Sequence, residues 1–90
     1  MKIPVTKEMI EELYSLFASI ENPKDFEDLF NDLCTEREIE QMAQRVAAAK
    51  LLIKGNTYNK VIEKTDISSA TLSRVSRCVQ YGNGYKKFLK

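Results

Sequence analysis

Residues 57–79, TYNKVIEKTDISSATLSRVSRCV, decide the fold. Thr57 and Ser68 can each cap a short helix, so this stretch predicts one helix over 58–64 and a second over 69–79. Asp66 lies in the three-residue break between them, and Asp is one of the few residues that accept left-handed backbone geometry. Two short helices joined in this way have the helix-turn-helix arrangement, although an ordinary helical hairpin gives the same spacing.

The apolar and polar positions of this stretch separate onto two faces. The apolar set, which is placed to hold the second helix steeply across the first, is Val61, Ile67, Leu72 and Val75. The outward face of the second helix carries small, hydroxyl and arginine side chains and no acid: Ser69, Ala70, Ser73, Arg74 and Arg77. Such a face suits the major groove of DNA, where bulky side chains would prevent close approach.

Upstream of this stretch, three further helices are expected. Thr6 and Asn22-Pro23 are start signals for the first two, and Thr35-Glu36-Arg37-Glu38 has the form of a capping box for the third. The third helix should end at Gly55, which tolerates left-handed geometry beyond a helix C-terminus. That helix is apolar around most of its circumference. It is therefore either the central core helix of one chain or the core of a dimer, in which a partner covers the second face.

Downstream, Gln80-Tyr81-Gly82-Asn83-Gly84 predicts a loop. A final helical turn should then dock through Tyr85, Phe88 and Leu89. The sequence contains no internal repeat and no long linker. We therefore expect a single all-helical domain over 1–90, which consists of a helical dimerisation core in 1–55, the helix-turn-helix in 57–79, and a turn with a docking helix in 80–90.

Composition argues against several classes of function. The 90-residue chain has no His, and its two cysteines, Cys34 and Cys78, fit neither a disulfide framework nor a metal-ligand set. We therefore expect no enzyme, no metal site and no resident cofactor. Because no signal peptide or membrane span is recognisable, a cytoplasmic protein that does not enter the membrane is expected.

Charge is distributed unevenly along the chain. Residues 1–56 hold seven Lys/Arg and eleven Asp/Glu, a net charge of −4. Residues 57–90 hold seven Lys/Arg and two Asp/Glu, a net charge of +5. This asymmetry indicates a polyanionic partner, such as double-stranded DNA, for the basic half.

From about Leu33 to Gly84, the chain resembles the Trp repressor superfamily, most closely its YerC/YecD-like branch. The resemblance is carried by the capping box at Thr35, by Leu51-Leu52-Ile53-Lys54-Gly55 and by Ala70-Thr71-Leu72-Ser73-Arg74, in that order. Tyr81-Gly82-Asn83-Gly84 is typical of the branch. The resemblance implies an all-α, TrpR-like homodimer with intertwined helices, whose paired helix-turn-helix units bind a two-fold symmetric operator.

The resemblance also implies an effector site at Thr35, Arg45 and Arg74, because tryptophan in the Trp repressor lies between the dimer core and the recognition helix. Val75, however, replaces a glycine that leaves room for the indole, and Cys78 replaces a serine that helps to hold the amino group. These departures argue against L-tryptophan and leave another small co-repressor, or none. Without an effector, Arg45 would form an intersubunit salt bridge and Arg74 would contact DNA.

The sequence thus predicts a sequence-specific transcriptional regulator, a repressor by family, that acts as a homodimer. The side chains expected at base edges are Ser69, Ala70, Ser73 and Arg77. Those expected at phosphates are Thr57, Asn59, Lys60 and Thr71. Arg74 is divided between DNA and an effector. The alternative is a helical dimer that binds another protein through its acidic first half and has no DNA function.

Overall fold

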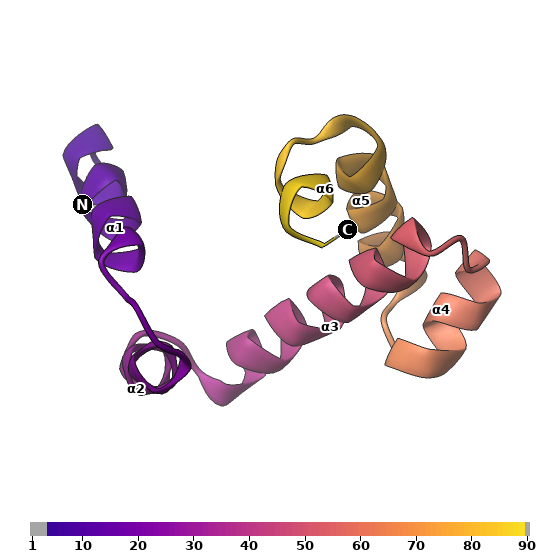
Figure 1. Cartoon of the computed structure of the whole chain (residues 1–90), viewed down its shortest axis with the longest axis horizontal. Coiled ribbons are helices and arrows are strands. Elements are labelled where there is room, and N and C mark those ends of the chain that lie inside the picture. The colour runs from indigo at the N-terminus through magenta and orange to yellow at the C-terminus, as the bar shows by residue number, and fades with distance from the viewer. Residues whose placement is uncertain (1–3, 90) are drawn as a thin grey trace. The chain divides into compact units, whose positions relative to one another are not determined.

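The computed structural model describes residues 4–89, and the regular structure in that range is entirely helical. Figure 1 shows the elements, which are α1 (Lys7–Ala18), α2 (Pro23–Leu33), α3 (Glu36–Ile53), α4 (Tyr58–Thr65), α5 (Ser69–Tyr81) and α6 (Gly84–Phe88). The predicted all-α class is confirmed. The chain divides after Thr35 into two compact units. The expected organisation as a single domain with three functional parts stays a prediction.

The first unit contains α1 and α2, and both helices begin at the predicted capping residues. Thr6 Oγ1 accepts a hydrogen bond from Met9 N at 3.2 Å, and Asn22 Oδ1 accepts one from Asp25 N at 2.9 Å. An aromatic cluster joins the two helices, with the ring centroid of Phe17 5.5 Å from that of Phe30. Neither helix contains a buried residue. This unit therefore has an internal contact but no enclosed core.

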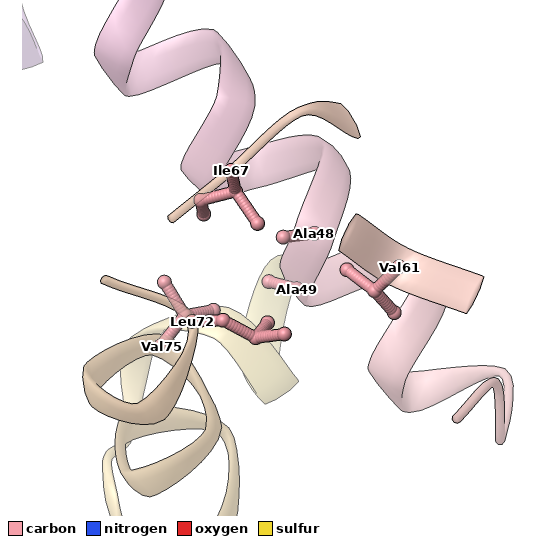
Figure 2. Close-up of a cluster of buried hydrophobic side chains, with 6 residues drawn as sticks. All are labelled: Ala48, Ala49, Val61, Ile67, Leu72 and Val75. Carbon is pink, nitrogen blue, oxygen red and sulfur yellow. The ribbon is translucent and has the colours of Figure 1, made fainter. Parts of the chain in front are cut away.

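The second unit is built on the C-terminal half of α3, against which α4, α5 and α6 pack (Figure 1). Its core consists of side chains from α3, α4, the turn and α5, which point toward one another in Figure 2: Ala48, Ala49, Val61, Ile67, Leu72 and Val75. The two alanines have short side chains, so the other helices can approach α3 closely. The four apolar positions predicted to hold the helix pair together are all buried.

The two predicted helix breaks have the expected backbone geometry. Gly55 follows α3 with φ +95°, and its N–H donates to Leu52 O while Asn56 N–H donates to Leu51 O. This pair of bonds is a Schellman motif, which satisfies carbonyls at the end of the helix. Asp66 ends α4 with φ 59° and donates its backbone N–H to Ile62 O at 2.9 Å. Both breaks are therefore fixed by the residues that the sequence places there.

The sequence predicts a loop over 80–84, but in the structure helices occupy most of this range. α5 continues through Tyr81, and α6 already begins at Gly84, so only Gly82 and Asn83 separate them. Lys86 Nζ donates to Gln80 O at 3.1 Å and so caps a carbonyl at the end of α5. Tyr85 and Leu89 pack against the core as expected, whereas Phe88 is 79% exposed in the chain.

Candidate nucleic-acid interface

α5 is positioned by its start and by its buried face. Ser68 Oγ accepts a hydrogen bond from Thr71 N at 3.2 Å, as a helix cap does. Leu72 and Val75 are 0% and 1% exposed, and the face of α5 that carries them packs against α3 and α4. The turn is held as well, because Gln44 Nε2 of α3 donates to Thr65 O at 3.2 Å. The orientation of α5 is thus determined by contacts at both its start and its middle.

The face of α5 that points away from this core carries the residues predicted to reach base edges. Ser69, Ser73 and Arg77 follow one another at intervals of four residues, while Ala70 and Arg74 form an adjacent row. All five are exposed. α5 contains no Asp or Glu. A phosphate backbone or the acceptor-rich edge of guanine would therefore meet arginines and hydroxyls here without repulsion from α5.

The residues predicted to contact phosphates lie at the start of α4 and near the start of α5. Thr57 Oγ1 caps α4 by accepting from Lys60 N at 3.3 Å, and Asn59 and Lys60 are exposed. Thr71 differs from them, because it is half-buried and its Oγ1 accepts a hydrogen bond from Ser68 Oγ at 2.9 Å. Its hydroxyl is therefore engaged in the capping turn of α5.

A polar cavity of about 340 Å³ lies beside this interface, within the second unit. Its walls come from α3 on one side and from the turn and the start of α5 on the other: Arg37, Gln41, Gln44, Arg45, Asp66, Ile67, Ser68 and Thr71. Of the three expected effector residues, only Arg45 lines this cavity. Arg74 is exposed on the outward face of α5, and Thr35 belongs to the first unit.

Arg37, Gln41, Gln44 and Asp66 had no role in the functional interpretation of the sequence. On α3, the lining residues Arg37, Gln41, Gln44 and Arg45 recur at intervals of four, three and one residues, which places them on one helix face. That periodicity was available in the sequence. What the sequence could not supply is the packing of the turn and of α5 opposite this face.

Two further findings concern metals and membranes. Among residues 4–89, no group of three or more His, Cys, Asp or Glu side chains could hold a metal ion. None of the helices in this same range is both long enough and apolar enough to cross a membrane.

Two capped helices joined at a residue with left-handed backbone geometry, the second with an exposed basic face, form an arrangement typical of helix-turn-helix DNA-binding proteins. The sequence profile of the Trp repressor protein family matches residues 8–90. The chain belongs to this family. It is a family of DNA-binding regulators and not of enzymes, and the chain is accordingly a DNA-binding regulator in general terms.

Individual relatives agree with this assignment. The uncharacterized protein YerC of Bacillus subtilis is 50% identical over 76 residues, which cover 81% of this chain and 73% of YerC. A crystal structure of a candidate Trp repressor from Staphylococcus aureus matches with a TM-score of 0.87 at 35% identity, over 93% of this chain and 85% of the other. A TrpR-like protein from Eubacterium eligens matches with a TM-score of 0.83 at 40% identity, over 91% and 84%. The predicted TrpR-like fold and the resemblance to YerC are confirmed.

Proposed function

We propose that the chain is a homodimeric transcriptional repressor that binds a two-fold symmetric operator through paired α4–α5 units. The observation that carries this proposal is the face of α5, which is exposed, contains arginines and hydroxyls, and lies on a helix without a carboxylate. In this proposal Ser69, Ala70, Ser73 and Arg77 reach base edges in the major groove. The repressor role rests on membership of the family.

The phosphate contacts would come from the start of α4. Thr57, Asn59 and Lys60 are exposed there and would set the register of the protein on the duplex. Thr71 would add a contact only where its capping hydroxyl remains accessible. Arg74 would contact DNA, because it shares the exposed face of α5 and does not line the polar cavity.

Exposed apolar side chains support the homodimer. On α3, which the sequence shows to be apolar around most of its circumference, Val46 is 43% exposed. On α1, Met9 and Leu16 are 54% and 43% exposed, and α5 ends with Tyr81 at 81%. Each of the two units thus exposes large apolar side chains, and exposed apolar surface is characteristic of interaction sites. A second copy of the chain would cover it in the proposed assembly and would set two α5 helices at a fixed spacing.

Control by a small effector is part of the proposal, and L-tryptophan is not the ligand that the site residues favour. Val75 is 1% exposed and belongs to the core. In this proposal its side chain would occupy space that the glycine expected here from the resemblance to the Trp repressor leaves open. Cys78 is half-buried and offers a thiol, a weaker hydrogen-bonding group than the hydroxyl of serine.

Binding to a fluorescent duplex, measured by anisotropy between 50 and 200 mM salt, tests the proposal. The wild-type chain should bind and should weaken steeply with salt, because phosphate contacts release counterions. Ser73→Glu places a carboxylate on the exposed face of α5 and should weaken binding at least tenfold. Asn31→Glu adds the same charge to exposed α2 and should retain most of the affinity.

The competing function is a protein-interaction module. The exposed apolar side chains of the first unit favour this function as well, because a different protein could bind there and cover them. Under that hypothesis Ser73→Glu has no effect on the binding of the partner protein. The complex with a co-purifying partner then survives both nuclease treatment and high salt. Wild-type chain that binds no duplex at any salt concentration would reject the DNA-binding proposal.

A further inference from the structure

The polar cavity between α3 and the start of α5 has a cationic lining. Arg37 and Arg45 lie two turns apart on one face of α3, and both line it. Asp66 is the single acidic residue in the lining, so the wall carries a net charge of one positive unit. Within residues 4–89, neither guanidinium takes part in an ion pair or hydrogen bond, and the salt bridges Lys7–Glu11 and Lys24–Asp28 lie away from the cavity, in α1 and α2.

The hydrogen-bonding groups around the cavity are mainly donors suited to an oxyanion. A guanidinium presents five N–H groups in a planar fork that matches carboxylate and phosphate geometry. Gln41 adds a side-chain amide, while the amide of Gln44 is held by its bond to Thr65 O. Asp66 has the opposite preference, because its carboxylate accepts hydrogen bonds and repels a second negative charge. A group with a single negative charge therefore fits the lining better than a group with two.

The size and polarity of the cavity restrict the ligand further. A volume of about 340 Å³ lies at the lower end of the range of about 300–1,000 Å³ for small-molecule sites. Ile67 is the one apolar side chain among the lining residues. An indole or another large aromatic ring would find few apolar partners here, whereas a hydrophilic molecule would exchange its hydrogen bonds with water for bonds to the protein.

We infer that this cavity is an oxyanion site in which Arg37 and Arg45 bind a phosphate or carboxylate group with a single negative charge. The group belongs either to a small hydrophilic metabolite or to the DNA backbone, since the cavity borders the start of α5. Both sources share the chemistry of guanidinium recognition. The second source rests on the proposed DNA-binding function, whereas the first does not.

The first arm of the test uses inorganic phosphate and the full chain without DNA. Phosphate is titrated against chloride at constant ionic strength, and NMR follows the side-chain amides of Gln41 and Gln44 and the Nε–H groups of both arginines. A free-anion site predicts saturable shifts that weaken at least tenfold in Arg37→Gln and in Arg45→Gln. Lys50→Gln removes an exposed charge from the same helix, outside the cavity, and should leave the titration unchanged.

The second arm measures duplex affinity as a function of salt. If the DNA backbone supplies the anion, free phosphate causes no saturable shift. Each arginine variant then makes the negative slope of log K against log salt shallower by about 0.9, because one phosphate contact is lost. Arg37 is exposed, so Arg37→Gln should fold normally, and circular dichroism checks both variants.

The two arms separate the cavity from the proposed function. Phosphate shifts in a chain that binds no duplex would support the site and reject the function. Duplex binding with unchanged slopes, together with a phosphate titration that is flat or insensitive to both arginine variants, would support the function and overturn the site.

Discussion

The residue that best separates base recognition from simple charge attraction is Arg77. It is exposed and stands in the row with Ser69 and Ser73 on α5. An arginine there can donate two hydrogen bonds to guanine, which distinguishes one base from the others.

Replacing Arg77 with Ala should weaken binding to the preferred duplex by about 1–3 kcal/mol and relax the choice of base at one position of each half-site. The measurement compares anisotropy titrations on the preferred duplex and on a scrambled one. Arg77→Lys retains the charge and should restore the affinity for the scrambled duplex only. An equal loss on both sequences would make Arg77 a phosphate contact instead.

Gly82 is a residue whose role is steric. A Cβ built on Gly82 would lie 2.6 Å from the backbone oxygen of Cys78, which accepts the Gly82 N–H bond that ends α5. At Gly84, a Cβ would meet nothing within 4 Å.

Gly82→Ala should therefore lower the free energy of unfolding by about 1–3 kcal/mol, because either the capping bond or the end of α5 must shift. Gly84 is the first residue of α6, and Gly84→Ala should leave the free energy of unfolding unchanged or raise it by up to about 1 kcal/mol. Urea denaturation of both variants measures the difference. Equal stability of the two would show that the close approach at Cys78 is not required.

Single residues with a local mechanism are well predicted from sequence. Thr6, Asn22, Thr57 and Ser68 cap their helices, and Asp66 adopts the left-handed conformation, because each depends on its own neighbours. The oxyanion cavity is different. Arg37 and Arg45 could be placed on one face of α3 from their spacing, but the opposite wall depends on long-range packing that periodicity does not encode.

At the scale of the element, α4, the turn and α5 pack against α3 around one shared core. Leu72 is the largest of the fully buried side chains among the described residues, with 0% exposure, and it lies in this core (Figure 2). The adjacent Ser73 is exposed and is not part of that core.

Leu72→Ala should destabilise the chain by about 2–5 kcal/mol through the cavity that it creates. DNA affinity should fall with it, because α5 loses its fixed orientation. Ser73→Ala changes the neighbouring residue on the outward face and should alter stability by less than about 0.5 kcal/mol. Thermal unfolding followed by circular dichroism compares the two. A Leu72 variant as stable as wild type would contradict the packing described here.

Element boundaries were predicted less well at the C-terminus than elsewhere. The glycines at 82 and 84 suggested a five-residue loop, yet α5 runs to Tyr81 and α6 begins at Gly84. Capping of Gln80 O by Lys86 comes from a residue six positions away, beyond the reach of local rules. Phe88 was expected to dock and is exposed, because Tyr85 and Leu89 already take the positions against the core.

At the scale of the whole molecule, the central feature is apolar surface that one chain leaves uncovered. Val46 lies on the longest helix and is exposed, while Ala48 and Ala49, two and three positions further on, are completely buried. α3 therefore buries one face against its own chain and presents another. The sequence could indicate that this helix needs cover on two faces, but it left open whether the same chain or a partner provides it.

Val46→Glu should convert the proposed dimer into a monomer, because an unpaired carboxylate at an apolar interface is strongly destabilising. Sedimentation equilibrium measures the mass directly. Glu63→Gln changes the charge by one unit on exposed α4 and should leave the mass unchanged. Wild-type chain that sediments as a monomer, or a Val46 variant that stays dimeric, would show that α3 is not the interface.

In the proposed assembly, two copies of the chain present two α5 helices to one operator. Selection of bound duplexes from a random DNA pool, with purified chain near physiological salt, tests it most directly. We expect an enriched palindrome whose half-sites are separated by about one helical turn, roughly 10 base pairs. Recovery of no motif, both alone and with a cell metabolite extract added, would contradict it and favour a protein partner for the same surface.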